Sequence, residues 1–121
     1  MKLWLGLLVL GAIGTLCRAG AIGAVQRLGG RFPWATLTVN LLGCLAFGLV
    51  LALAERGRIG DDLRRLLLVG FMGAFTTFSS FAGDTLGLLQ SGRFGAALLN
   101  VLGQNVLGVS FVALGTWLGR G

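Results

Sequence analysis

Gly-Phe-Met-Gly-Ala-Phe-Thr-Thr-Phe-Ser-Ser-Phe, residues Gly70 to Phe81, is the stretch that decides the fold, and it lies inside an otherwise apolar region. Phenylalanines are interleaved there with small hydroxyl residues. Two glycines precede the Thr76–Thr77 pair, so the backbone is free to leave helical geometry at this point. A bilayer tolerates non-helical backbone only where it is buried in protein or lines a cavity. The stretch therefore predicts an intramembrane site, with a helix break between Gly73 and Thr76.

The composition around this stretch is that of a membrane protein. Soluble domains carry roughly 25% charged residues, whereas 12% of these 121 residues are charged and 55% are hydrophobic. Four apolar stretches are each near the ~20 residues that span a bilayer: Leu3 to Val25, Phe32 to Ala54, Leu66 to Leu89 and Phe94 to Leu118. Because the connections are short, we expect residues 1–121 to form one all-α integral membrane domain of four transmembrane helices, the third broken mid-membrane.

The N-terminal stretch has features of a cleaved signal peptide. Lys2 and the leucine-rich run that follows could serve as its first two regions, with Ala19-Gly20-Ala21 as the cleavage site. However, Arg18 stands immediately before that site and the apolar pattern resumes beyond it, which favours a membrane span. The chain has no His and its two cysteines fall inside predicted spans, so neither a metal cluster nor a nucleophile–His pair is predicted.

The charges indicate topology rather than a partner. If the termini share a side, that side holds six basic residues and the opposite side three, or four with Arg18. This is a weak bias under the positive-inside rule, so we expect insertion in both orientations. The basic residues flank the spans and form no stripe, which argues against nucleic-acid binding. The charged segment from Glu55 to Arg65 is interpreted as a solvated linker between two spans.

Polar residues inside the first two spans are candidates for function. Arg18 either attracts anions or locks a helix, or it reaches the interface after a short first helix. Thr36, Asn40, Gly43 and Phe47 share one face of the second span. The Asn40 amide either makes a packing hydrogen bond between helices or takes part in function.

The third span carries the chemistry of the opening stretch. Phe71 and Phe75 are interpreted as a packing stripe, whereas hydroxyl residues surround Phe78 and Phe81, and Asp84 follows. Hydroxyls donate to anions, and aromatic ring edges carry positive partial charge. Such groups stabilise an anion without a fixed charge that would trap it, which a conducting site requires. Carbonyls freed by a helix break would suit a hard cation such as Na⁺.

The fourth span places two amides one turn apart. Asn100 and Gln104 share a face, and they predict either a polar track or a clamp between helices. Asn105 and Ser110 point elsewhere. The Gly115–Gly119 spacing is a weak packing signal.

These motifs together resemble the small fluoride channel family, Fluc/CrcB. The resemblance rests on the glycine-rich first span leading to Arg18, on Pro33 to Gly43, and on Gly70 to Phe81, and it covers nearly the whole chain. It implies an antiparallel, dual-topology homodimer in the cell inner membrane, with two fluoride pores made jointly by both chains. Fluoride trapped in the cytoplasm would leave passively down its electrochemical gradient.

The resemblance also implies roles for particular residues. Phe78 and Phe81 match the pore phenylalanines and Asn40 the pore asparagine, while Arg18 lies near the vestibule. Thr36, Thr77 and Ser79 would lie along the polar path, and the backbone carbonyls of Gly73 and Thr76 would hold a central structural Na⁺. This chain departs from the family pattern at Asp84, where Glu is usual, and at Asn100 and Gln104, where Tyr and Ser are usual; all three are expected along the path.

Other functions fit the sequence less well. A small dual-topology multidrug-type exporter needs a carboxylate deep in the membrane, and Asp84 lies near a span end. A non-transporting subunit of a membrane complex explains the glycines but not the hydroxyl and phenylalanine cluster. An enzyme is disfavoured because a lone Asp84 makes no acid–base pair.

Overall fold

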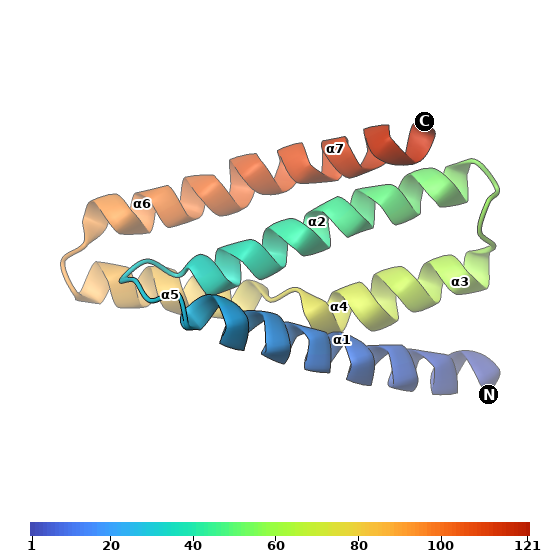
Figure 1. Cartoon of the computed structure of the whole chain (residues 1–121), viewed down its shortest axis with the longest axis horizontal. Helices are drawn as coiled ribbons and strands as arrows, with labels where there is room; N and C mark the ends of the chain where they lie inside the picture. The colour runs from blue at the N-terminus through green and yellow to red at the C-terminus, as the bar shows by residue number, and fades with distance from the viewer.

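A computed structural model describes all of residues 1–121 as a bundle of long helices (Figure 1). Four helical segments are long and apolar enough to cross a membrane, at Lys2–Gln26, Trp34–Glu55, Asp61–Gln90 and Phe94–Arg120. The first two are the continuous helices α1 (Lys2–Gln26) and α2 (Trp34–Glu55). The four predicted spans are thus confirmed as helices, with ends within a few residues of those expected.

The other two spans are composite. The third consists of α3 (Asp61–Arg65), the π-helical η1 (Leu66–Met72), α4 (Gly73–Phe75) and α5 (Phe78–Gln90). The fourth consists of α6 (Phe94–Leu102), the π-helical η2 (Gly103–Leu107) and α7 (Gly108–Arg120). The end of the charged segment predicted to be a solvated linker is instead the first turn of the third span, where two acidic residues lie at the positive end of the helix dipole.

The third span is interrupted at the Thr-Thr pair and not at the glycine before it. Gly73 has helical angles, with φ −60° and ψ −32°. The chain becomes extended at Thr76 (ψ 161°) and Thr77 (φ −150°, ψ 107°), and α5 begins at Phe78. The predicted break is therefore confirmed, but its start at Gly73 is wrong because that glycine continues the helix.

Glycines bring α2 and α7 into backbone contact. A Cβ atom built on Gly48 would lie 2.1 Å from the carbonyl oxygen of Val112, and one on Gly115 would lie 2.0 Å from that of Leu45. Gly119 is similarly close to α2. The Gly115–Gly119 spacing is therefore a principal helix contact, which is more than the weak signal expected from sequence.

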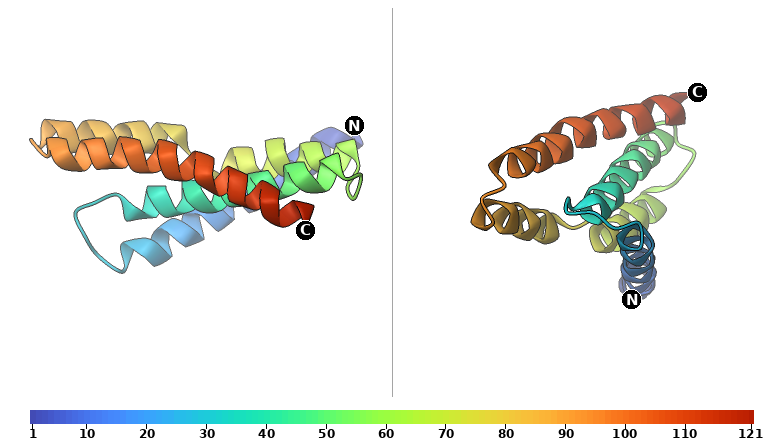
Figure 2. Two further views of the ribbon diagram at one scale, coloured as in Figure 1. Left: turned by 90° about the horizontal axis from the view of Figure 1, so that it is seen from above. Right: turned by 60° about the vertical axis from the view of Figure 1, so that its left-hand side comes forward.

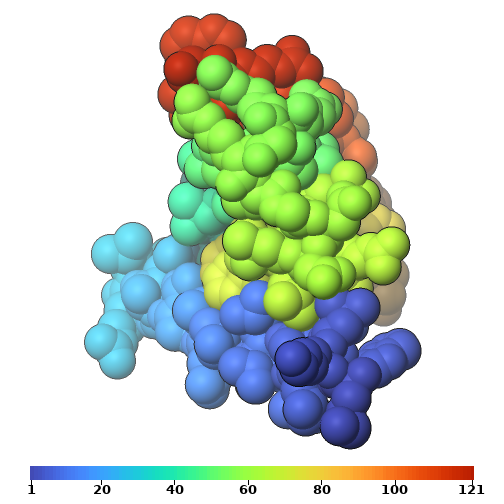
Figure 3. Space-filling view, turned by 90° about the vertical axis from the view of Figure 1, so that its right-hand side faces the viewer, coloured from blue at the N-terminus to red at the C-terminus, as the bar shows by residue number.

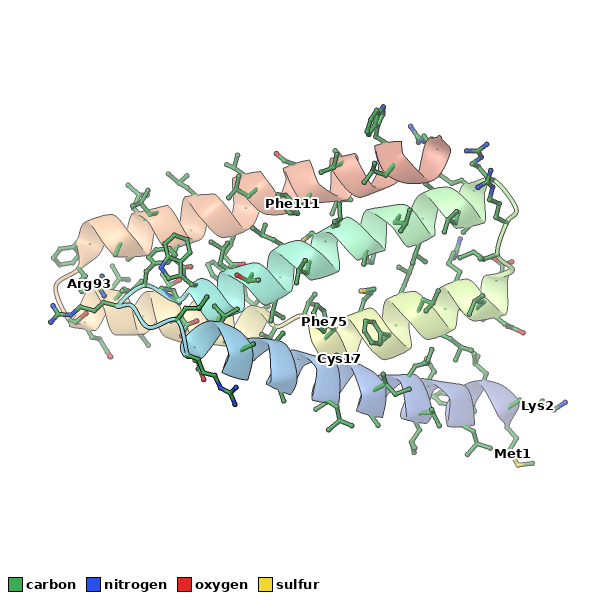
Figure 4. All side chains as sticks on the ribbon, viewed as in Figure 1. Met1, Lys2, Cys17, Phe75, Arg93 and Phe111 are labelled. Carbon is green, nitrogen blue, oxygen red and sulfur yellow. The ribbon has the colours of Figure 1, made fainter.

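Both chain termini lie at the same end of the bundle (Figure 1). Met1 and Lys2 mark that end, and Arg93 lies at the other (Figure 4), in agreement with the expected arrangement of charges. Figure 2 shows that the helices cross one another at an angle rather than running parallel. Seen end-on, α1 and α7 occupy opposite edges, with the α2 and third-span segments between them (Figure 3).

Few side chains are buried within one chain. Only 18 of the 121 residues are buried, and most of the large hydrophobic side chains are exposed. Phe75 is among the buried residues and stacks on Phe71 with ring centroids 5.6 Å apart, which confirms the predicted packing stripe. The apolar exterior is suited to lipid and to contact with further helices.

Candidate functional site

Asn40 replaces the backbone hydrogen bonds that the third span loses at its break. The N–H of Thr77 donates to Asn40 Oδ1 at 2.8 Å, and Asn40 Nδ2 donates to the carbonyl of Thr77 at 3.1 Å. A primary amide has an acceptor and two donors, so one side chain satisfies both backbone groups of an extended residue. The helix break is thus tied to the middle of α2.

The close approach of the break to α2 requires Gly43. A Cβ atom on Gly43 would lie 2.1 Å from Thr76 Cγ2, so a side chain here would force Thr76 to move. On the other side, the N–H and hydroxyl of Thr76 both donate to the carbonyl of Met72, at 3.0 Å and 2.9 Å. Thr76 therefore forms the last hydrogen bonds of the helix before the break. Its methyl group packs against the backbone of α2 at Gly43.

Thr77 caps the helix after the break. Its Oγ1 accepts from the N–H of Ser80 at 3.2 Å and donates to the Ser80 hydroxyl at 2.9 Å. This is the usual N-cap arrangement for threonine, and the Thr-x-x-Ser spacing could have revealed it from sequence. Thr77 is buried, whereas the predicted path residue Ser79 is exposed, with its hydroxyl 3.3 Å from Thr77 Oγ1.

Arg18 reaches the break from α1. Its Nη1 donates to the carbonyl of Thr76 at 3.3 Å, which is the kind of contact that the helix-locking interpretation predicts. In a continuous helix that carbonyl would accept from Ser80, whose N–H is used by Thr77. Arg18 therefore supplies a donor to a carbonyl that the break leaves free.

The carbonyl of Gly73 lacks even this partner. The N–H of Thr77 would bond it in a continuous helix but donates to Asn40, so the Gly73 oxygen loses its usual helical partner. A Cβ atom on Gly73 would meet nothing within 4 Å, so this face of the helix is open. Backbone carbonyls are suitable ligands for a hard cation, and the pair at Gly73 and Thr76 fits part of such a site.

A cavity of about 390 Å³ lies beside the break, between the third span, α2 and the fourth span. Phe78 and Phe81 form one wall, with ring centroids 5.4 Å apart and planes inclined by 63°. The Phe78 side chain is 79% exposed, although it lies in the middle of the chain's third span. The polar groups of the lining come from Asn40, Thr76, Thr77, Gln104 and Asn105.

Gln104 joins the Asn40 cluster from the fourth span. Asn40 Nδ2 donates to Gln104 Oε1 at 3.0 Å, in addition to its bond to the Thr77 carbonyl. The Nε2 of Gln104 is buried and has no hydrogen-bond partner. Two helices and the break thus meet at one amide pair on the wall of the cavity.

Thr36 and Asp84 lie in a separate hollow of about 210 Å³, which is also lined by residues of the connection between α1 and α2. Thr36 Oγ1 donates to Asp84 Oδ2 at 2.6 Å, a short bond of the charge-assisted kind. Thr36 is buried and Asp84 is half-buried. The predicted path residues are therefore divided between two hollows, both of which border on α2.

Asn100 lies apart from both hollows. It is fully buried between α6 and α5, where its Nδ2 donates to Thr85 Oγ1 at 2.9 Å and its Oδ1 has no partner. Of the two predictions for the fourth-span amides, this residue fits the clamp between helices rather than the track. Asn105 and Ser110 are exposed and bonded to their own helix.

The structure adds residues that the sequence analysis did not select. Cys44 and Met72 line the larger cavity beside Phe47. Cys44 follows Asn40 by one helical turn, and this spacing is the signal that could have identified it. Of the predicted site residues, the larger cavity thus unites Asn40, Gly73, Thr76, Thr77, Phe78, Phe81 and Gln104.

Comparison with known proteins gives consistent results. Residues 5–116 match the family model described as CrcB-like protein, Camphor Resistance (CrcB). A protein of Nitratidesulfovibrio vulgaris named fluoride-specific ion channel FluC is 50% identical over 112 residues, covering 91% of this chain and 90% of the relative. Relatives of the same name are 45% identical in Maridesulfovibrio salexigens (91% and 89% covered) and 47% identical in Thermus thermophilus (90% and 88% covered).

Proposed function

Because this chain belongs to the CrcB/FluC family of fluoride channels, we propose that two copies build antiparallel pores through which cytoplasmic fluoride leaves the cell. The protein is a multi-pass fluoride channel of the cell membrane and not an enzyme. The transport is passive, because fluoride that accumulates in a cell with an inside-negative potential moves outward down its electrochemical gradient. Dual topology, the pore residues and a bound Na⁺ are the further parts of this proposal.

One observation carries the proposal for a pore shared by two chains: the cavity beside the break has an incomplete wall. Phe78 borders it and is 79% exposed, and the open face of Gly73 lies on the same cavity. A bilayer does not tolerate free carbonyls and cavity-lining polar groups against lipid. A second chain seated on this face would cover both and would close the path.

The lining has the chemistry that a fluoride path requires. Fluoride is small and strongly hydrated, so donors must replace its water at close range. The proposed donors are the hydroxyls and amides of the site together with the positive ring edges of Phe78 and Phe81. The proposed path residues are Thr36, Asn40, Thr77, Phe78, Ser79, Phe81, Asp84, Gln104 and, at the vestibule, Arg18, whereas Asn100 is left out because it is buried apart from both hollows.

A structural Na⁺ would be held by the carbonyls of Gly73 and Thr76, the pair left without helical partners. When bound, the ion would offset the negative ends of these carbonyl dipoles at the dimer axis. Arg18 already contributes positive charge next to the Thr76 oxygen. The Na⁺ and the Arg18 guanidinium would therefore both stabilise the carbonyl oxygens at the break.

Growth in fluoride tests the channel and its pore residues together. Bacteria that lack fluoride export are transformed with the wild type, with Phe81→Ile or with Phe94→Ile. We expect the wild type and Phe94→Ile, which alters an exposed ring outside both cavities, to restore growth. Phe81→Ile removes a ring edge from the path and should fail to restore growth at equal expression. Equal growth with Phe81→Ile and the wild type would contradict this role of Phe81.

Labelling tests the antiparallel arrangement. A single cysteine is placed in the loop after α2 by Arg58→Cys, in a background of Cys17→Ser and Cys44→Ser. A membrane-impermeant maleimide applied to intact cells should label about half of the chains if both orientations insert. Complete labelling, or none until the cells are lysed, would show a fixed orientation and would contradict dual topology.

A further inference from the structure

Arg93 joins the two connections at the end of the bundle that lies away from the termini (Figure 4). It is the N-cap residue of α6, and its Nη1 donates to the carbonyl of Arg31, which lies 62 residues away in the connection between α1 and α2. Arg27, the C-cap residue of α1, belongs to the same connection. The contact therefore brings the guanidinium of Arg93 against a segment that carries two further arginines.

The charges of these three arginines are not neutralised within the chain. Arg27 and Arg31 are exposed, and Arg93 is half-buried. Both ion pairs of the structure lie elsewhere, within α3 and between the ends of α2 and α7. The carboxylate of Asp84, in the hollow beneath the α1–α2 connection, accepts a hydrogen bond from Thr36 and is half-buried. This end of the chain thus presents three positive charges and no exposed carboxylate.

The positions of the arginines in the spans place them at the level of lipid headgroups. Trp34 begins α2 three residues after Arg31, and Phe94 begins α6 immediately after Arg93. Both aromatic side chains are exposed. Tryptophan is enriched where the apolar core of the bilayer meets the headgroups. The arginines stand just outside these span ends, which is the depth of the lipid phosphates.

An exposed apolar stripe runs along α6 from Arg93. Phe94, Leu98 and Leu102 follow one another at intervals of four residues, so they share one face of the helix. All three side chains are exposed. An acyl chain would pack against such a face below its own phosphate, whereas a soluble anion would make no use of it. The combination of free arginines with this stripe therefore fits a phospholipid better than free phosphate.

We propose that Arg27, Arg31 and Arg93 form a binding site for the headgroup of an anionic phospholipid. A guanidinium donates paired hydrogen bonds to phosphate and stays charged at physiological pH. Arg93 uses Nη1 for the Arg31 carbonyl, and its remaining N–H groups are available to the lipid. The bound phosphate offsets the mutual repulsion of the three arginines. The site is separate from the fluoride path, and the inference does not rest on the proposed function.

Quenching of Trp34 by brominated lipid tests the site. Trp4→Phe and Trp117→Phe leave Trp34 as the single tryptophan of the channel in phosphatidylcholine liposomes. A basic residue beside an anionic headgroup contributes about fivefold to lipid preference. Brominated phosphatidylglycerol should therefore quench Trp34 at a mole fraction at least about fivefold lower than brominated phosphatidylcholine. Equal quenching by the two lipids would overturn the proposal.

Two arginine variants separate a site from general attraction to a charged surface. Arg31→Gln keeps the backbone carbonyl that Arg93 binds, and it should reduce the preference for phosphatidylglycerol about fivefold. Arg58→Gln removes an exposed arginine from the connection between α2 and α3, and it should leave the preference unchanged. An equal loss in both variants would mean diffuse attraction and would refute a site at Arg31.

Two further measurements distinguish a lipid from a soluble anion. Inorganic phosphate at constant ionic strength should leave the quenching by brominated phosphatidylglycerol in place, and loss of the preference would assign the arginines to a free anion instead. In liposomes of phosphatidylcholine alone, Arg31→Gln should release fluoride at the wild-type rate. Slower release by Arg31→Gln there would place this arginine on the anion path and would contradict the lipid assignment.

Discussion

Asn40, which is half-buried, and Asn100, which is fully buried, should respond in opposite ways to the same substitution. Asn40→Leu preserves approximate volume but removes the partner of both backbone groups of Thr77, which are buried at the break. Each stranded group costs roughly 1–3 kcal/mol, so the free energy of unfolding should fall by about 2–6 kcal/mol. The substitution also deprives Gln104 Oε1 of its donor.

Asn100→Leu should lose less stabilising free energy than it gains. It loses one hydrogen bond, to Thr85 Oγ1, which contributes about 0.5–1.5 kcal/mol net. It also eliminates a fully buried oxygen that has no partner, which relieves a penalty of about 1–3 kcal/mol. Thr85 keeps its own bond to the Phe81 carbonyl. We therefore expect the stability of Asn100→Leu to equal or exceed that of the wild type.

Unfolding by SDS in mixed micelles, followed by tryptophan fluorescence, measures both effects on one scale. Asn40→Leu should unfold at a much lower SDS fraction than the wild type, and Asn100→Leu at the same or a higher fraction. The reasoning is refuted if Asn100→Leu is the more destabilised of the two, or if Asn40→Leu unfolds with the wild type. The second result would mean that Asn40 does not hold the break.

Two further predictions concern the helix contact and the cavity. Gly115→Ala should destabilise the fold by about 1–3 kcal/mol in the same assay, because its Cβ would lie 2.0 Å from the Leu45 carbonyl oxygen. Gly87→Ala, where nothing lies within 4 Å, should be neutral or stabilising, since alanine is the better helix former. A small methanethiosulfonate reagent should block fluoride efflux by adding bulk to Cys44 in the cavity. Cys44→Ser should abolish this block and Cys17→Ser should preserve it; the reverse pattern would contradict the assignment of the cavity.

The sequence sufficed to predict the four spans and the existence of a break. Long apolar runs between short polar connections have few alternatives in a bilayer, so the spans follow from composition. The position of the break did not follow from the glycines. The break lies at Thr77, where the amide of Asn40, 37 residues away in the chain, replaces the backbone hydrogen bonds. Local backbone freedom at Gly73 was therefore a poor guide to where the helix ends.

Only part of the site was predicted, because local periodicity does not show contacts between residues distant in the chain. Periodicity correctly placed Asn40, Gly43 and Phe47 on one cavity-facing side of α2. It also grouped Asn100 with Gln104, but the π-helical turn η2 begins between them and changes the helical register. Gln104 consequently meets Asn40 while Asn100 meets Thr85. A one-residue change in winding is not visible in a pattern of polar positions.

Fluoride efflux from proteoliposomes, followed with an ion-selective electrode and repeated with chloride, tests the central claim most directly. The cavity beside the Thr76–Thr77 break offers donors and ring edges but no fixed charge of its own. The wild type should therefore release fluoride rapidly and retain chloride. Release of both anions at similar rates, or retention of fluoride by folded protein, would contradict a selective fluoride path built on this break.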